Sequence, residues 1–343
     1  MDFIRNHINS FPKIESHYRR AETSKQYLES NLNMARMYSL YCEKCEDEGR
    51  KSASETVYRK VFNTEFNLSF HTPKNDRCDL CEEFDVARRN GTTVSDEKRA
   101  IFENHKRSKA ETKVERDMDR LLTKPVLCFD LENVFALPRG NASCFFYKRK
   151  INTYNLTAVL HYKDSAEPDP SKQTKKEIYC ALWSELIGGR TGNDIASAVA
   201  AILSKVFSGH PNIKELITWS DSCVPQNRNS IMSYQMQDTL KKLPHVQSIT
   251  MKFCEPGHSS IQEVDAVHSA IEHYFAKLEI HSPLTLTRLM IKARKKEPYI
   301  VIQMKSSDFL DFQSCSKEYK GYSKVPFTKV KELRFVSTEH KRV

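Results

Sequence analysis

VLCFDLENVF, at residues 126–135, is the stretch that decides the expected fold of this chain. It follows Pro125, where a long helical pattern ends and β-branched and aromatic residues take over. An apolar run of this length is typical of a buried strand. Asp130 lies at its centre, the most rigid place that a strand offers to a functional side chain. We therefore expect a new domain to begin here and to carry a functional carboxylate.

The segments that follow alternate between strand and helix patterns. The order along the chain predicts strands at 126–135, 143–150, 153–162 and 177–184, a helix at 193–207, a strand at 214–220, a helix at 227–243, a strand at 246–253 and a helix at 261–278. Three neighbouring strands followed by alternating helices and strands describe a mixed sheet with helices on both faces.

Three aspartates fall on this pattern at positions that one class of nuclease requires. Asp130 lies on the first strand, Asp221 ends the strand at 214–220, and Asp265 begins the last helix. In the RNase H arrangement, carboxylates lie on the first strand, at the end of the fourth core strand and on a later helix. The strand at 177–184 makes the strand count inexact. The alternative is that three of the 44 acidic residues coincide with these elements by chance.

The chemistry of phosphodiester cleavage gives such acids a purpose. Mg²⁺ or Mn²⁺ needs carboxylates that converge from separate elements, and in-line attack uses two ions roughly 3.5–4 Å apart. Asp130 is the expected bridge between the two ions. Three neighbours are accessory candidates, namely His258, Glu263 and His268. Asp265 and His268 share a helix face, whereas Glu263 points elsewhere.

The chain is basic, with 54 Lys and Arg against 44 Asp and Glu in 343 residues. DNA is the expected partner because Lys and Arg gain by displacing counterions from phosphates. A basic protein without a nucleic-acid ligand would show the same charge. The candidate DNA contacts are Arg59, Lys60, Arg228, Arg294, Lys295 and Lys296. No membrane association is expected, since the chain has no apolar leader and no run of about 18 apolar residues.

The first 122 residues are helical in pattern, charged and poor in glycine. Two CxxC pairs, Cys42 with Cys45 and Cys78 with Cys81, have a spacing that zinc favours. The preferred zinc ligands are Cys45, Cys78, Cys81 and His105, with His71 as the alternative ligand. Four cysteines would be the simplest set, and reduced thiols without metal are the competing interpretation. We expect a structural Zn²⁺ ion to stabilise this all-α module.

Several longer motifs resemble one protein family. They are HINSFPKIESHYRR (7–20), YLESNLNMARMYSLYCEKCEDEG (27–49), SETVYRKVFNTEFNLSFHTPKNDRCDLCEEF (54–84), FFYKRKINTYNL (145–156), SDSCVPQNRN (220–229) and EPGHSSIQEVDAVHSAIEH (255–273). The chain resembles a family of transposon-derived animal proteins, abundant in insects, from about residue 6 to beyond residue 300. Members look like DDE/D-type transposases with an RNase H-like core. The resemblance implies DNA cleavage and strand transfer, a nuclear location and a homodimer that pairs two DNA ends.

The resemblance also assigns residues. By motif, the three acids fall on Asp130, Asp221 and Asp265, and the metal-binding side chains on Cys45, Cys78, Cys81 and His105. The segment between PGHS and Asp265 is one residue longer than the family pattern, so Glu263 stays an alternative third acid. The expected organisation is α+β: a helical zinc-binding and DNA-binding module at 1–122, an RNase H-like core at 123–282 and a basic extension with short strands at 283–343.

The expected function is that of a transposase, or of a DNA endonuclease derived from one, which uses two Mg²⁺ or Mn²⁺ ions. The alternative is a domesticated DNA-binding protein whose RNase H-like core is catalytically inactive. A third interpretation, a DEDD-type exonuclease, is suggested by the DxE opening that Asp130 and Glu132 form. That interpretation lacks the HxxxD motif, because His268 is followed by Glu272.

Overall fold

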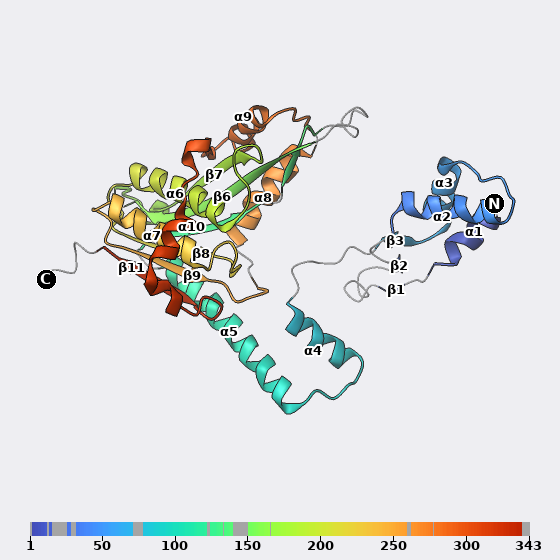
Figure 1. Ribbon diagram of the computed structural model, residues 1–343, viewed down its shortest axis with the longest axis horizontal. Coiled ribbons are helices and arrows are strands. Elements are labelled where there is room, and N and C mark those ends of the chain that lie inside the picture. The colour runs from blue at the N-terminus through green and yellow to red at the C-terminus, as the bar shows by residue number, and fades with distance from the viewer. Residues whose placement is uncertain are drawn as a thin grey trace. The chain divides into compact units, whose positions relative to one another are not determined.

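The structure is a computed structural model in which the chain divides into two units, Met1–Asp76 and Arg77–Val343 (Figure 1). The described residues are 2–11, 14–15, 26–28, 32–70, 78–121, 124–132, 134–139, 150–164, 166–258, 262–276 and 278–337.

The first unit combines three helices with a small sheet. Its elements are α1 (Asp2–Asn9), β1 (Ile14–Glu15), β2 (Gln26–Leu28), α2 (Met34–Asp47), α3 (Glu55–Glu65) and β3 (Leu68–Phe70). Strand β2 pairs antiparallel with β1 and parallel with β3. In the core between the helices, the hydroxyl of the buried Tyr58 lies 2.8 Å from His7 Nδ1. The segment expected to be all-α therefore contains three short strands.

Two helices of the expected N-terminal module belong to the second unit. They are α4 (Asp79–Arg89) and α5 (Asp96–Leu121), and the rings of Phe84 and Phe102 stack between them with centroids 4.0 Å apart. Near the end of α5, the buried Asp119 carboxylate accepts hydrogen bonds from Trp219 Nε1 and Lys252 Nζ, both at 2.9 Å. Because these contacts bind α5 to the large sheet, the chain divides at 76–77 and not at 122–123.

One mixed sheet forms the centre of the second unit. Its strands are β4 (Val126–Leu131), β5 (Phe135–Leu137), β6 (Ile151–Lys163), β7 (Thr174–Ser184), β8 (Glu215–Ser220), β9 (Ser248–Phe253), β10 (Ile300–Gln303) and β11 (Glu332–Val336). They lie in the order β10-β7-β6-β4-β8-β9-β11, and β5 pairs with β6. Strand β6 is antiparallel to β4 and β7, whereas β8 is parallel to β4 and β9. A mixed sheet in an α+β chain is thereby confirmed.

Helices cover both faces of this sheet, as expected (Figure 1). Helices α6 (Gly192–Gly209), α7 (Ser230–Lys242) and α10 (Phe312–Glu318) pack on one face, and α8 (Gln262–Phe275) and α9 (Pro283–Ala293) on the other. Successive residues of β4 alternate between the two cores, with Phe129 on the α6 side and Cys128 on the α8 side. Asp130 continues the alternation and lies on the α8 face.

Polar side chains fix where the helices begin. Thr191 and Asp194 form a capping box at the start of α6. Asn229 caps α7 by accepting a hydrogen bond from the Met232 N–H at 2.9 Å. Ser282 caps α9, whose first residue is Pro283. These caps set the ends of the loops that join the helices to the sheet.

Two expectations about the sheet need revision, and a third cannot be compared with the structure. The strand at 177–184, which made the expected strand count inexact, is β7, an interior strand between β6 and β10. The strand expected at 143–150 falls outside the described residues except for Lys150. The region 283–343 is no separate extension, because β10 pairs with β7 and β11 with β9, which adds a strand at each edge. Within the described residues, no helix has the length and apolar character needed to span a bilayer.

Candidate carboxylate and cysteine–histidine sites

Two of the predicted acids lie on neighbouring parallel strands. In the pairing of β4 with β8, Cys128 lies opposite Trp219. Asp130 and Asp221 each come two residues further along their strands. Both carboxylates therefore lie at the same end of the sheet, where β4 and β8 finish side by side.

Helix α8 brings the third acid to this end. Val264 and Val267 pack the first turn of α8 against the sheet, and the exposed Asp265 lies between them in sequence. Burial raises the pKa of Asp130 to about 7, and the negative charges of Asp221 and Asp265 add to the effect. Three aspartates from β4, the end of β8 and α8 thus interact electrostatically. We call them the carboxylate site.

The loop after β8 holds the Asp221 side chain. Asp221 Oδ1 accepts a hydrogen bond from the Cys223 N–H at 3.2 Å and a short one from Asn227 Nδ2. Asn227 is itself buried, at 4% exposure. Hydrogen bonds of this kind fix a carboxylate rotamer before any ligand binds.

A fourth acid, Glu132, comes directly after the last residue of β4 and is buried. Glu132 is 3% exposed and accepts a hydrogen bond from Asn155 Nδ2 at 2.5 Å. Burial raises the pKa of Glu132 to about 8, and the charge of Glu272 contributes. Glu132 is therefore largely protonated at neutral pH, which makes it a weak ligand for a divalent ion.

The accessory candidates Glu263 and His268 lie in different surroundings. Glu263 pairs with Arg120 of α5, and its Oε1 lies 3.9 Å from His161 Nε2. Of the two residues considered for the third acid, Asp265 is the one whose charge affects Asp130. Burial lowers the pKa of His268 to about 4, so this imidazole is neutral and cannot pair with a carboxylate as a cation.

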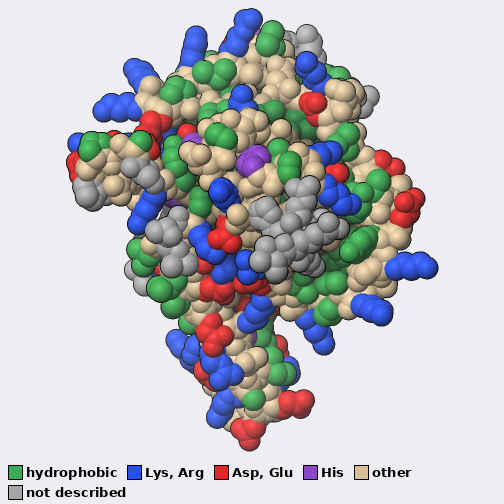
Figure 2. Space-filling view, turned by 90° about the vertical axis from the view of Figure 1, so that its left-hand side faces the viewer, with side chains coloured by type: hydrophobic (Ala, Val, Ile, Leu, Met, Phe, Trp, Pro, Cys, Tyr) green, Lys and Arg blue, Asp and Glu red, His purple; other side chains and the backbone are tan. Residues whose placement is uncertain are grey.

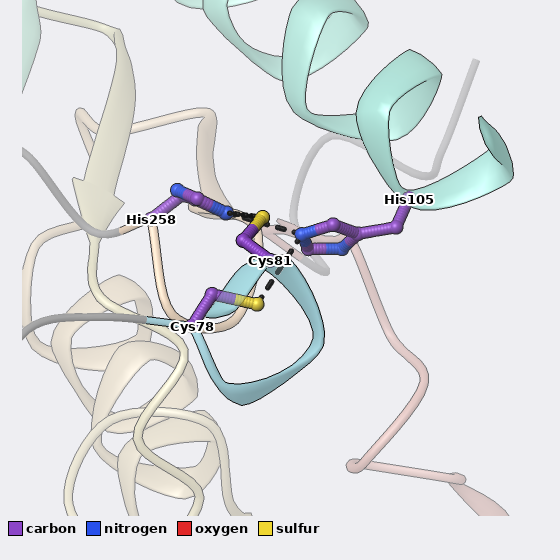
Figure 3. Close-up of side chains that lie close together, drawn as sticks. All are labelled: Cys78, Cys81, His105 and His258. Atoms are coloured by element: carbon purple, nitrogen blue, oxygen red, sulfur yellow. Dashed lines mark hydrogen bonds between the residues drawn. The ribbon is translucent and has the colours of Figure 1, made fainter. Parts of the chain in front are cut away.

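A second group of ligands lies where α4, α5 and the segment after β9 meet (Figure 3). Cys78 and Cys81 come from the start of α4, His105 from α5, and His258 follows β9. His105 Nε2 lies 3.3 Å from Cys78 Sγ and 3.0 Å from His258 Nε2, and His258 Nε2 lies 3.3 Å from Cys81 Sγ. We call these four residues the Cys–His cluster.

The geometry of this cluster suits a tetrahedral metal ion. All four ligand atoms lie within 4.8 Å of one another. Zinc bonds of about 2.3 Å to sulfur and about 2.0 Å to nitrogen separate neighbouring ligands by roughly 3.3–3.8 Å. Within the described part of the chain, only this cluster is so tightly grouped, so the oxygens of the carboxylate site lie farther apart. The Cys–His cluster could therefore hold a metal ion such as zinc.

Neighbouring side chains orient the cluster. Glu255 Oε1 lies 3.4 Å from His105 Nδ1, on the side of the ring away from the cluster. Ser108 Oγ donates to Glu255 Oε2 at 2.7 Å, and Lys331 Nζ donates to Ser108 Oγ at 2.7 Å. A carboxylate behind a ligating histidine fixes the ring orientation and raises the basicity of the other nitrogen.

A glycine lets the segment after β9 approach α4. Gly257 has φ +73°, and a Cβ added there would lie 2.8 Å from Cys78 Cβ. Any larger residue would therefore collide with a cluster residue in addition to being strained. The PGH sequence at 256–258 is thus explained by the approach of this segment to the cluster.

The predicted zinc ligands are found only in part. Cys78, Cys81 and His105 come together, but the fourth member of the group is His258. Cys45 belongs to the other unit, where it is 1% exposed and packs in the core with Met37 and Tyr41. The CxxC that includes Cys45 lies on a regular helix, whose apolar face explains the cysteine. His71 lies outside the described residues.

The predicted DNA contacts differ in exposure. Arg59 is exposed and pairs with Glu55, and Arg294 pairs with Glu297. Lys60, Lys295 and Lys296 are exposed. Figure 2 shows Lys and Arg at many places on one face, mixed with Asp and Glu.

Arg228 departs from the expectation. It is 7% exposed, donates to the Val330 carbonyl at 3.3 Å and lies over the Phe253 ring at 5.9 Å. Its contacts are therefore those of a structural residue, and a surface role in binding the DNA backbone does not fit its burial.

Comparison of the chain with protein-family models, curated proteins and solved structures found no match.

Proposed function

We propose that the second unit is an RNase H-like, metal-dependent DNA nuclease of the DDE/D transposase type. The observation that carries this proposal is the parallel register of β4 and β8, which brings Asp130 and Asp221 to the same end of the sheet. Asp265, from α8, acts on Asp130 through its charge. If the short β5 is left out, β8 is the fourth strand of the core along the chain. The acids then lie on the first strand, after the fourth strand and on a later helix, as the RNase H arrangement requires.

The residues of the site have distinct tasks. Two bound Mg²⁺ or Mn²⁺ ions would supply an activated oxygen nucleophile and stabilise the leaving oxygen. Asp130, on which the charges of both other acids act, would hold the ions together with Asp221 and Asp265. It gives up its proton as the pH rises through about 7, so metal binding is expected to strengthen over that range. The hydrogen bonds of Asn227 and Cys223 hold Asp221 ready to bind.

We propose further that the Cys–His cluster holds a structural Zn²⁺ ion. Four protein ligands complete a tetrahedron and leave no position for a substrate, as in structural zinc sites. The Glu255 carboxylate behind His105 supports the same assignment. The cluster joins α4 and α5 to the segment after β9, so the proposed ion crosslinks parts of the second unit that are far apart in sequence.

A second candidate is a DNA-binding protein whose core is inactive. It is favoured by the looser grouping of the three carboxylates, which within the described residues do not approach one another as closely as the cluster ligands do. Carboxylates in a nuclease without its ions repel one another, so the same looser grouping is also expected in an active enzyme. Cleavage separates the two candidates.

The test uses end-labelled duplex DNA with Mg²⁺ or Mn²⁺. Asp221→Asn is expected to reduce cleavage by about a thousand-fold, because one ligand of the proposed ions loses its charge. Asp238→Asn is the matched control: this aspartate pairs with Lys242 on α7 and leaves cleavage unchanged.

DNA binding in buffer without Mg²⁺, Mn²⁺ or chelator, which leaves the proposed Zn²⁺ in place, should be equal for the native chain and both variants. Binding without cleavage by the native chain would establish the inactive candidate, and equal cleavage by Asp221→Asn would remove Asp221 from the reaction.

A further inference from the structure

We infer that the Cys–His cluster and α5 position the carboxylate site, so that metal held in the cluster strengthens binding of divalent ions by Asp221 and Asp265. The inference rests on the proposed function. The positioning residues are His258, Asp119 and Arg120, none of which contacts a reacting atom.

The first link runs through the segment after β9. His258 is the cluster ligand contributed by this segment, and it lies seven residues before Asp265. Glu255, in the same segment, approaches His105 of α5 at 3.4 Å and accepts a hydrogen bond from Ser108 of α5 at 2.7 Å. A metal ion shared by His105 and His258 would therefore fix Glu255–His258 against α5, shortly before α8 begins.

The second link lies at the other end of α5. Arg120 pairs with Glu263 in the first turn of α8, two residues before Asp265. The Glu263 side chain is only 10% exposed, so the pair is little screened by solvent. The first turn of α8 is thus held at Glu263, and His258 lies four residues before the first residue of this helix, Gln262.

The third link reaches the strand that precedes Asp221. Asp119, 4% exposed, accepts a hydrogen bond from Trp219 Nε1 at 2.9 Å. Trp219 lies two residues before Asp221. Asp119 also binds Lys252 of β9 at 2.9 Å, which ties β8 and β9 to the same turn of α5. One helix therefore contacts the elements that carry two of the three acids.

These links have a consequence for metal affinity. Two ions bind tightly only if the carboxylates are already in place, because ordering them on binding costs free energy. Residues that orient metal ligands typically change affinity by 10–100-fold when they are replaced. With the cluster empty, the contacts of Glu255 with Ser108 and His105 still join the segment after β9 to α5, but His258 is no longer fixed to α5 by a metal ion.

The experiment measures Mn²⁺ binding to the full chain, purified from zinc-supplemented medium and freed of unbound metal by gel filtration, by calorimetry without DNA. Asp221→Asn defines which part of the signal belongs to the carboxylate site. Arg120→Gln is expected to weaken that binding about 10–100-fold with zinc content unchanged. Cys81→Ser, which removes a cluster ligand, is expected to weaken it by a similar factor. Lys106→Gln is the matched control, since Lys106 is exposed on α5 and pairs with Glu103 of the same helix.

A rescue separates positioning from a general loss of stability. The double variant Arg120→Glu with Glu263→Arg re-forms the pair with reversed charges and should return Mn²⁺ affinity to within a few-fold of the native value. A fall in melting temperature without a change in Mn²⁺ affinity, for Arg120→Gln and Cys81→Ser alike, overturns the inference and leaves the proposed function standing. If the native chain shows no Asp221-dependent Mn²⁺ binding, the proposed function fails, and this inference fails with it.

Discussion

Asp130→Asn is expected to abolish DNA cleavage and, at the same time, to raise the free energy of unfolding at pH 8. Cleavage should fall on the order of 10⁴-fold or more, because a proposed metal ligand loses its charge. The gain in stability follows from the pKa of Asp130, which rises from an ordinary 3.8 to about 7 on folding. Above pH 7 the native protein holds a buried carboxylate that the unfolded chain exposes to water, and Asn removes that cost.

The raised pKa of Asp130 also determines how the free energy of unfolding changes with pH. The folded protein keeps the proton at a pH where the unfolded chain has lost it, so this residue makes the protein less stable as pH rises from about 4 to about 7. Three pKa units correspond to about 4 kcal/mol, and the partial exposure of Asp130 reduces the expected gain to about 2–4 kcal/mol at pH 8. Urea unfolding at pH 5 and pH 8 measures it.

The control for this prediction is Asp238→Asn, which changes an aspartate that pairs with Lys242 and whose side chain is 22% exposed. Its effect on unfolding should be within about 1 kcal/mol and the same at both pH values. An Asp130→Asn variant whose stability gain is the same at pH 5 and pH 8 would show that the native carboxylate does not titrate between them. Retained cleavage in that variant would exclude Asp130 as a metal ligand.

Loss of the cluster metal is the second large effect. Cys81→Ser is expected to lose the single zinc ion and to lower the melting temperature by on the order of 10 °C, because a structural zinc ion contributes a large share of the folding free energy of the segments that it joins. Zinc is measured by atomic emission after gel filtration, and unfolding by circular dichroism. His258→Ala should behave in the same way.

Two cysteine controls make this test specific. Cys315→Ser changes an exposed thiol on α10 and should leave zinc content and melting temperature unchanged. Cys45→Ser changes a thiol buried in the first unit, and it should keep one zinc per chain even if that unit is less stable. Loss of zinc from Cys45→Ser, with zinc retained in His258→Ala, would restore the ligand set expected from sequence.

Local patterns were sufficient to find the strands and helices that carry the acids. Asp130 stands out because an apolar run surrounds it, and Asp265 because the apolar residues around it repeat with a helical period. The number of core strands could not be settled without knowing which strands pair. Only the strand order of the sheet shows that β7 is an interior strand and that β8 is the fourth core strand along the chain. The sequence of a short strand does not specify its partner. Local pattern therefore predicts the C-terminal strands but does not predict that β10 pairs with β7 and β11 with β9.

The Cys–His cluster shows the opposite case. The CxxC at 78–81 is a local signal, but His258 lies 177 residues from Cys81. No motif near His258 identifies it as a partner of Cys81. Two neighbouring residues are weak indications of a binding segment: Gly257 allows a close backbone approach, and Glu255 provides a carboxylate. Local pattern favours Cys45 instead, because a second CxxC resembles the missing half of a zinc site.

The sequence by itself therefore determined the class of fold, the identity of the candidate acids and three of the four residues of the Cys–His cluster. These follow from the periodic burial of side chains in single helices and strands, which depends on neighbours only a few residues away. Tertiary structure alone decided which cysteines and histidines meet, that Arg228 is buried, and that α5 belongs with the large sheet. Those outcomes depend on contacts between residues a hundred or more positions apart, and no local period encodes such contacts.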